Sequence, residues 1–224
     1  MVMKTAHPAL KTDLGGTELA SPIVLAAGTC GYVDELSVAL DLSRIGAVTT
    51  KSITPEARSG NAPMRVLDVK AGMVNAVGLA NMGVEAFVRE KTTSVEQVPT
   101  VVIGSIAGFS IDDYVRVASE FSRIDSIPII EMNVSCPNCN DGRLASSNPA
   151  VLAEHVRAVR EVLDHQKLFV KLPPSTDALL PLAAGRWARQ RARRCAQRSP
   201  PSTAATCVPR SASNSRIAAC LACS

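Results

Sequence analysis

The stretch IIEMNVSCPNCN, residues 129–140, combines two features that together indicate a class of fold. It begins with apolar residues, which is typical of a buried strand, and it ends in asparagines, a serine, a proline and two cysteines. Strands that are apolar on both faces occur in parallel sheets covered by helices. Ligands bind such sheets at the carboxyl ends of the strands. The stretch therefore predicts an α/β protein with a functional site at its strand ends.

The same alternation of strand and helix extends to both sides of this stretch. A two-residue turn at Gly15-Gly16 predicts a β-hairpin near the N-terminus, and residues 55–83 form a long loop rich in Gly, Pro and Asn. Buried strands are predicted over residues 22–28, 46–54, 100–108, 127–135 and 167–175. Helices are predicted over residues 34–46, 84–94, 110–124 and 148–163, with Ser110 capping the third, and Asn148 capping the fourth before Pro149.

An open doubly wound sheet and a closed eight-stranded barrel both fit this alternation. The polar residues favour the barrel, because each unit carries them at the carboxyl end of its strand, where a barrel assembles its active site. These residues are Gly28-Thr29, Lys51-Ser52, Ser105, Asn133 to Asn138, and Lys171. We predict an α/β fold of the (β/α)8 TIM-barrel type, incomplete here, with about five βα units plus an N-terminal β-hairpin. Five strands leave open sheet edges, so we expect this chain to fold poorly or aggregate.

The character of the sequence changes after Ala184. Residues 185–224 contain eight arginines and no lysine, aspartate or glutamate, and they have no strand-length apolar run. We therefore divide the chain into a partial barrel domain, 1–184, and a basic, Cys-containing tail, 185–224. The tail has the composition of a GC-rich gene translated out of frame, so a frameshift is the first interpretation and a natural disordered tail is the alternative. A zinc site in the tail is a weaker hypothesis, because only Cys220 and Cys223 have the spacing of a metal pair.

The charge of the whole chain, +4, comes from this tail. With eight of the 24 basic residues removed, residues 1–184 hold 16 basic against 20 acidic side chains, a net charge of −4. This mildly acidic body gives no electrostatic basis for binding nucleic acid. The sequence has no apolar run long enough to span a membrane and no secretory signal, so we expect a cytoplasmic protein with reduced thiols.

The amides at the strand ends indicate the chemistry of the ligand. An asparagine side chain offers an acceptor and two donors on one plane, which suits a ring with alternating C=O and N–H groups. The candidates are Asn75, Asn133 and Asn138, and Cys136 lies between the last two as a candidate base or nucleophile. Each of these also has a plain structural interpretation, as a loop cap or as a small buried thiol.

Four motifs resemble those of the dihydroorotate dehydrogenase family. They are TTKSIT with the following R.GN.P.R (49–65), GMVNAVGLANMGVEAF (72–87), EMNVSCPN (131–138) and VKLPP (170–174). The resemblance covers residues 10 to about 184 and is to the class 1 enzymes, soluble flavoproteins with a cysteine base, and most closely to the catalytic subunit of subclass 1B. NAVGL together with NVSCPN favours this family over the similar flavoprotein domain of dihydropyrimidine dehydrogenase.

The resemblance implies oxidation of dihydroorotate to orotate in de novo pyrimidine (UMP) biosynthesis, with FMN as cofactor. Cys136 is implied as the base that takes the C5 proton, while hydride passes from C6 to the flavin. The implied contacts to FMN come from Ala27, Gly28, Lys51, Ser52, Ser105, Asn133 and Lys171. The implied contacts to the substrate come from Lys51, Asn75, Val77, Gly78, Leu79, Asn133 and Asn138.

The resemblance also implies partners. The full-length enzyme is expected to be a homo-oligomer, and electrons would leave through an FAD and iron–sulfur subunit in subclass 1B or to fumarate in subclass 1A. The family's later Asn-Thr pair and glycine-rich phosphate-binding strand ends have no counterpart in the tail, so this chain is a candidate for an inactive form. The alternative is a non-catalytic half-barrel that binds partners through its exposed sheet edge and basic tail.

Two positions depart from the family pattern or add to it. Ser105 stands where many relatives carry an asparagine against the flavin. Cys136 and Cys139 form a CxxC pair, but such redox pairs usually open a helix, whereas this one follows a strand.

Overall fold

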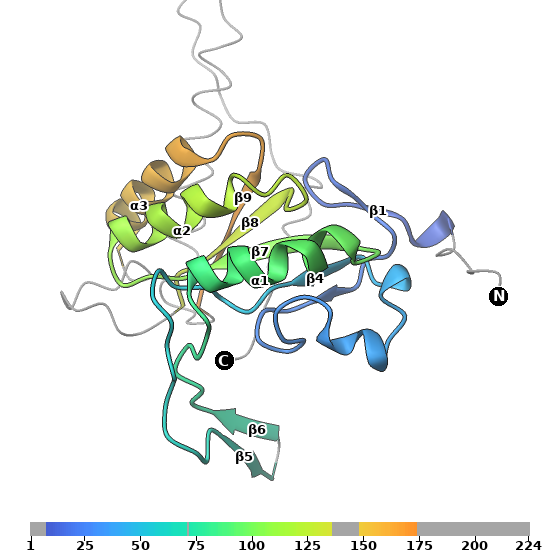
Figure 1. Ribbon diagram of the computed structural model, residues 1–224, viewed down its shortest axis with the longest axis horizontal. Coiled ribbons are helices and arrows are strands. Elements are labelled where there is room, and N and C mark those ends of the chain that lie inside the picture. The colour runs from blue at the N-terminus through green and yellow to red at the C-terminus, as the bar shows by residue number, and fades with distance from the viewer. Residues whose placement is uncertain (1–7, 71, 136–147, 174–224) are drawn as a thin grey trace, which may run out of the picture.

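A parallel sheet forms the centre of the molecule in the computed structural model, which describes residues 8–70, 72–135 and 148–173 (Figure 1). Its strands follow one another in space in the order in which they occur along the chain, β3-β4-β7-β8-β9. A doubly wound sheet would reverse this order part of the way through. The strands are β3 (Val24–Leu25), β4 (Ala47–Thr49), β7 (Val101–Ile106), β8 (Ile129–Asn133) and β9 (Lys167–Lys171).

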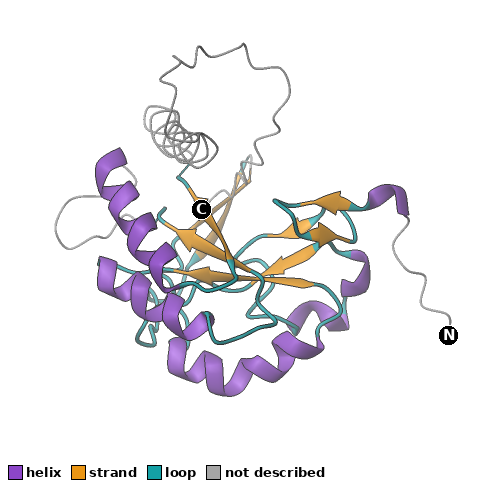
Figure 2. Ribbon diagram, turned by 90° about the horizontal axis from the view of Figure 1, so that it is seen from above, coloured by secondary structure: helices purple, strands orange, loops and turns teal. Residues whose placement is uncertain are grey.

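Three α-helices connect these strands and lie along one side of the sheet (Figure 2). They are α1 (Val84–Gln97), α2 (Ile111–Phe121) and α3 (Pro149–Val162). Right-handed crossovers between consecutive parallel strands place every helix on the same face, and the other face becomes the inside of a barrel wall. The predicted partial TIM barrel is therefore confirmed, with five parallel strands in the described part of the chain.

The two predicted helix caps, Ser110 and Asn148, are present with their hydrogen bonds. The Ser110 hydroxyl accepts from the N–H of Asp113, and the Asp113 carboxylate accepts from the N–H of Ser110, which completes a capping box. The Asn148 side chain accepts from the N–H of Ala150, and Pro149 occupies the first helical position, where its missing N–H costs nothing.

The main core lies between the sheet and the helices. Ile130 and Met132 point from β8 toward the helices and are fully buried, as are Phe87 on α1 and Phe121 on α2, whose rings stack at 4.9 Å between centroids. Each such side chain contributes ~1.5–3 kcal/mol on burial. The alternate residues of β8, beginning with Ile129, point to the opposite face, so one strand serves both sides of the barrel wall.

A short hairpin closes the amino-terminal end of that inner face. It follows a 3-10 turn, η1 (Pro8–Leu10), and consists of β1 (Thr12–Asp13) and β2 (Glu18–Leu19). Gly15 and Gly16 have φ of 62° and 84°, so they form the predicted two-residue turn. Leu19 packs in a cluster with Ala47, Ile103 and Ile129, which lie in the amino-terminal parts of their strands. The polar strand ends are left at the opposite end of the sheet.

Two predictions for the connecting segments were wrong. The helix predicted over residues 34–46 is instead two 3-10 turns, η2 (Glu35–Val38) and η3 (Leu42–Arg44). Asp41 separates them, because its backbone is extended at ψ 95° and its carboxylate caps the N–H of Ser43. Leu40, an apolar residue within the predicted range, is 42% exposed. The loop predicted over residues 55–83 contains an antiparallel hairpin of β5 (Val66–Val69) and β6 (Gly72–Asn75).

Candidate functional site

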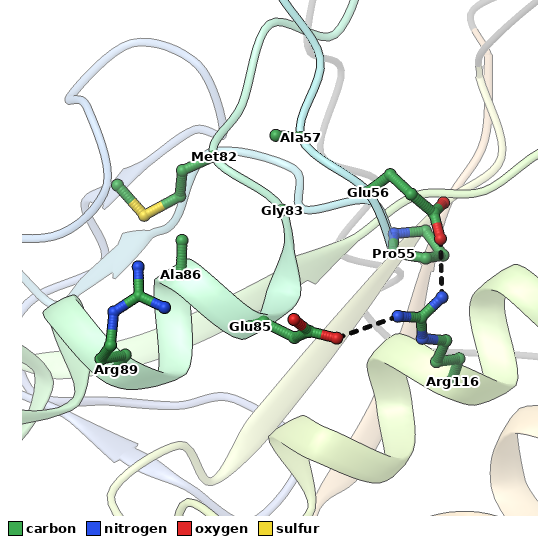
Figure 3. Close-up of a pocket in the computed structure, with 9 residues that line it drawn as sticks. All are labelled: Pro55, Glu56, Ala57, Met82, Gly83, Glu85, Ala86, Arg89 and Arg116. Atoms are coloured by element: carbon green, nitrogen blue, oxygen red, sulfur yellow. Dashed lines mark hydrogen bonds and ion pairs between the residues drawn. The ribbon is translucent and has the colours of Figure 1, made fainter.

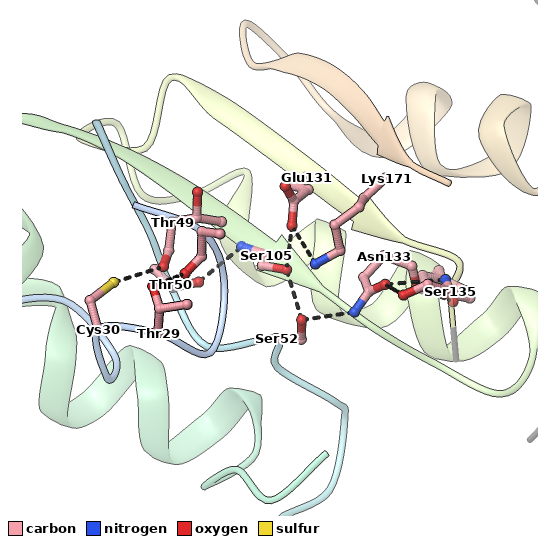
Figure 4. Close-up of polar contacts among 12 residues, drawn as sticks. Thr29, Cys30, Thr49, Thr50, Ser52, Ser105, Glu131, Asn133, Ser135 and Lys171 are labelled. Atoms are coloured by element: carbon pink, nitrogen blue, oxygen red, sulfur yellow. Dashed lines mark hydrogen bonds and ion pairs between the residues drawn. The ribbon is translucent and has the colours of Figure 1, made fainter. Parts of the chain in front are cut away.

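The carboxyl ends of neighbouring strands bring four of the predicted site residues together (Figure 4). Asn133, at the end of β8, donates from Nδ2 to Ser52 Oγ at 3.1 Å, although the two residues are 81 positions apart. Ser52 Oγ lies 2.9 Å from Ser105 Oγ on β7. Lys171, at the end of β9, joins the same group through Glu131. Ser52, Ser105 and Asn133 are buried, so their polar groups require these partners.

Glu131 is a member of this cluster that the sequence analysis did not select. Its side chain is 11% exposed, and its Oε1 lies 3.0 Å from the Lys171 ammonium, which is 10% exposed. The same oxygen accepts a hydrogen bond from Ser105 Oγ at 3.2 Å. The signal in the sequence was a carboxylate two positions before Asn133 in an apolar strand, hence on the same face, and a buried charge requires a partner.

The end of β8 is fixed on both of its sides. Asn133 Oδ1 accepts from the N–H of Ser135 at 3.1 Å and from its hydroxyl at 2.5 Å. The Asn133 carbonyl accepts from Tyr114 Oη on α2 at 2.8 Å. The segment after β4, which contains Ser52, stays hydrogen-bonded to β7. The Thr50 N–H donates to the Ile103 carbonyl, and the Ile53 N–H donates to the Ser105 carbonyl. The cluster therefore sits on rigid elements.

Ala27 and Gly28 lie in a turn directly after β3. The Ala26 carbonyl accepts from both the N–H and the hydroxyl of Thr29, at 3.2 and 2.7 Å, and Gly28 at the bend has φ 83°. A Cβ built on Gly28 would meet nothing within 4 Å, so its backbone faces open space. Cys30, two residues after Gly28, is buried. Burial raises the pKa of its thiol, which disfavours the reactive thiolate.

The two predicted lysines have different surroundings. Lys171 is paired with Glu131, whereas Lys51 forms no ion pair with any residue that the structure describes. Lys51 is half-buried, and its backbone N–H donates to the Gly31 carbonyl at 3.1 Å, which ties the segment after β4 to the segment after β3. An unpaired ammonium at this position is a cation available to an anionic ligand.

The substrate contacts predicted over residues 75–79 do not all lie at the strand ends. Asn75 is exposed on β6, in a hairpin that projects from the body, and the structure does not bring it to the cluster around Asn133 (Figure 1). Val77, Gly78 and Leu79 are half-buried in the segment that returns from the hairpin. Cys136 and Asn138 lie outside the described residues.

A buried asparagine that sequence reasoning missed, Asn81, holds this returning segment. Its Nδ2 donates to the Leu79 carbonyl at 2.7 Å, and its Oδ1 accepts from the N–H of Gly83 at 2.9 Å. Gly78 has φ 74°, and a Cβ there would lie 2.7 Å from the Asn61 side chain, so the turn requires glycine.

A cavity of about 310 Å³ lies elsewhere, where α1 begins, and shares no residue with the cluster (Figure 3). Arg116 on α2 pairs there with Glu56 at 2.6 Å and with Glu85 at 3.2 Å. All three side chains are about half exposed or more, so these pairs contribute little to stability. Because none of the predicted site residues lines the cavity, it is not the predicted site.

The described residues contain no helix long and apolar enough to cross a membrane. In the same part of the chain, no group of three or more His, Cys, Asp or Glu side chains could hold a metal ion. The tail cysteines considered for zinc lie outside it.

Comparison with known proteins identifies the family. Residues 9–184 match the family model described as dihydroorotate dehydrogenase. The chain is 34% identical over 176 residues to the dihydroorotate dehydrogenase B (NAD(+)) catalytic subunit of Trichlorobacter lovleyi, covering 79% of this chain and 58% of that protein. It is 40% identical over 179 residues to dihydroorotate dehydrogenase A (fumarate) of Limosilactobacillus reuteri, covering 78% and 58%.

A solved structure supports the fold. The dihydroorotate dehydrogenase of Eimeria tenella, in complex with ferulenol, superposes with a TM-score of 0.69 at 15% identity, covering 84% of this chain and 59% of that one. The chain thus spans somewhat under three fifths of the length of these relatives. The resemblance noted in its four motifs is confirmed, and the chain belongs to the dihydroorotate dehydrogenase family.

Proposed function

We propose that this chain carries the FMN- and substrate-facing strand ends of a class 1 dihydroorotate dehydrogenase, which oxidises dihydroorotate to orotate in cytoplasmic pyrimidine (UMP) biosynthesis. The observation that carries the proposal is the meeting of Ser52, Ser105, Asn133 and Lys171 at one end of the sheet. These residues come from four separate segments, and family membership gives their convergence a chemical meaning.

The residues present fit a flavin. Lys171 uses one of its three N–H donors on Glu131, and Asn133 uses one of its two Nδ2 hydrogens on Ser52, so both retain donors for a ring with C=O and ring-nitrogen acceptors. Lys51 adds an ammonium that forms no ion pair within the described part of the chain, and the Ala27-Gly28 turn adds an open backbone surface. FMN bound there would supply the hydride acceptor.

The protein side of the reaction is binding and proton removal. Lys51, Asn75, Asn133 and Asn138, with the backbone of Val77, Gly78 and Leu79, would hold the substrate ring. Cys136 would remove the proton from C5 as a general base, which a thiol can do when its pKa lies near the working pH. A fixed cation beside developing negative charge commonly contributes about 10²–10³-fold in rate, which is the role proposed for the lysines.

The electron acceptor and the assembly belong to the same proposal. One relative is named as the catalytic subunit of an NAD(+) enzyme and another as a fumarate enzyme, so both acceptors occur among similar proteins. We favour the first arrangement, with a separate subunit that carries FAD and an iron–sulfur cluster, and a homo-oligomeric full-length protein.

The gene offers a first test. We expect that the DNA beyond codon 184, translated in its other two frames, encodes an Asn-Thr strand end followed by two glycine-rich strand ends. Finding no such segments would remove the frameshift interpretation. It would favour the non-catalytic half-barrel, whose partner binding should weaken as salt is added.

The protein offers the decisive test. With the barrel sequence restored, we expect a yellow protein that reduces an acceptor when dihydroorotate is added. Replacement Cys136→Ala should abolish turnover and leave the flavin bound, because the base is lost and the cofactor contacts are not. Cys139→Ala is the matched control and should keep turnover, unless the two thiols act as a redox pair. Full activity in Cys136→Ala would disprove the assignment of the base.

A further inference from the structure

The strand-end cluster is a continuous chain of hydrogen bonds that starts on β8, passes through the segment after β4 and through β7, and returns to β8 (Figure 4). It runs from Asn133 to Ser52 at 3.1 Å, from Ser52 to Ser105 at 2.9 Å, and from Ser105 to Glu131 at 3.2 Å. Lys171 meets the same Glu131 oxygen at 3.0 Å. Each link joins a different pair of strand ends.

Two groups with a fixed role determine which atom donates in every link: one can only donate a hydrogen bond and the other can only accept. At one end, the Ser135 backbone N–H is a donor, so the atom of Asn133 that faces it is Oδ1 and the atom that faces Ser52 is the donor Nδ2. At the other end, the Glu131 carboxylate only accepts, so the single hydroxyl hydrogen of Ser105 is spent on it. Ser52 must then donate to Ser105 and accept from Asn133.

The chain therefore points one way, from the Asn133 amide to the Glu131 carboxylate. Hydrogen bonds to an ionised acceptor are stronger than neutral ones, and successive bonds with the same sense polarise one another. Glu131 is the one charged acceptor in this chain, and it also holds the Lys171 ammonium. One buried carboxylate oxygen thus accepts from both Ser105 and Lys171.

We propose that Glu131 is a positioning residue of the site. It is the terminal acceptor of the hydrogen-bond chain: it takes the Ser105 hydroxyl hydrogen, so that Ser52 donates to Ser105 and is left to accept from Asn133. It also holds Lys171 at the end of β9. The hydrogen-bond chain is a property of the protein by itself, whereas its purpose, the presentation of Asn133 and Lys171 to FMN and the substrate ring, rests on the proposed function.

Nuclear magnetic resonance of the side-chain amides tests the proposal in the 224-residue chain itself, with no ligand added. In protein labelled with ¹⁵N asparagine, the Asn133 amide is assigned by its loss in Asn133→Asp. We expect Glu131→Leu to move the Nδ2 proton signals of Asn133 toward those of a free amide and to speed their exchange with water. Glu131→Gln keeps an acceptor oxygen of the same shape, so it should restore most of the wild-type signature.

The control is Glu56→Gln, which removes an exposed carboxylate from its pair with Arg116 and should leave the Asn133 signals in place. Amide signals of Asn81, a buried asparagine whose side chain bonds to Thr54, Leu79 and Gly83 and not to the cluster, report whether each variant is folded. Asn133 signals that stay unchanged in a folded Glu131→Leu variant would overturn the proposal. If Glu131→Leu does not fold, the Glu131→Gln and Ser105→Ala pair decides: Ser105→Ala breaks the chain and should shift Asn133, and an unshifted signal overturns the proposal.

Binding of FMN separates this inference from the proposed function. Quenching of flavin fluorescence gives the dissociation constant, which we expect to be about tenfold higher in Glu131→Leu, a ratio equal to ~1.4 kcal/mol. Because the phosphate-binding strand ends have no counterpart in the tail, FMN binding is measured on the protein with its barrel sequence restored. If that protein gives the NMR response and binds no FMN, the hydrogen-bond chain is supported and the proposed function is not. FMN binding that is equal in wild type and Glu131→Leu would overturn the role of Glu131 at the ligand.

Discussion

At the scale of single residues, Glu131 and Lys171 form the one ion pair of the described chain in which both side chains are largely buried. The other ion pairs each include at least one side chain that is 40% exposed or more, whereas both members of this pair are about 10% exposed. Water screens the exposed pairs, and the buried pair has lost that screening together with its hydration. Removing one partner should therefore lower the free energy of unfolding more at the buried pair than at an exposed pair.

Replacement of Lys171 by Met tests this difference. The variant leaves the Glu131 carboxylate buried without its counter-charge, so we expect the free energy of unfolding to fall by ~3–5 kcal/mol. Arg116→Met is the matched control, because its partners Glu56 and Glu85 are exposed, and it should cost under ~1 kcal/mol. Urea unfolding of both variants measures the two values. Equal losses would show that the Glu131 pair is hydrated in solution.

At the scale of elements, a carboxylate joins the short turn η2 to helix α1. Glu35 accepts from the N–H groups of Tyr32 and Val33, each at 2.9 Å, and pairs with Lys91 on α1 at 3.1 Å. Partial burial works to raise the pKa of Glu35, but these backbone donors and the Lys91 ammonium outweigh it, so the pKa lies below its ordinary value. The charged form of Glu35 is therefore the one that the fold binds.

This contact should appear in the pH dependence of stability. A carboxyl whose pKa is depressed by folding stabilises fully above its unfolded pKa of about 4.3, and the contribution is lost as the pH falls through the folded pKa. We expect Glu35→Gln to be less stable than wild type at pH 7, by under ~1 kcal/mol because the site is partly exposed, and to lose less stability on acidification. Urea unfolding across pH 7 to 3 measures both, with exposed Glu96→Gln as control. A curve for Glu35→Gln parallel to that of wild type would contradict the assignment.

The sequence predicts these elements well where a pattern is local and poorly where it depends on pairing. Ser110 and Asn148 mark their helices because a cap acts on residues two or three positions away. The β5–β6 hairpin was missed because its strands are exposed on both sides and carry no buried alternation. Glu131 was missed because its partners lie on two other strands, β7 and β9. The register that places Asn133 opposite Lys171 is likewise set by the pairing of β8 with β9 and not by a local pattern.

At the scale of the whole molecule, the sheet has two edges in the described part of the chain. β3 pairs only with β4, and β9 pairs only with β8, whereas a closed barrel has no edge strand. The inner face carries the buried cluster of Leu19, Ala47, Ile103 and Ile129, so the hairpin of β1 and β2 covers the amino-terminal end of that face. An edge strand with unpaired backbone groups is the segment most prone to open or to pair with another chain.

Hydrogen exchange should therefore rank the strands. We expect amides of β7 and β8 to be the slowest to exchange, because both strands are paired on two sides and buried under the helices. Those of β3 and β9 should exchange faster, and those of the projecting β5–β6 hairpin fastest, because an isolated two-stranded sheet is marginally stable in water. Exchange followed by mass spectrometry at several protein concentrations measures this order. If β9 is as protected as β8 at every concentration, another part of the polypeptide covers that edge; if its protection grows with concentration, a second copy does.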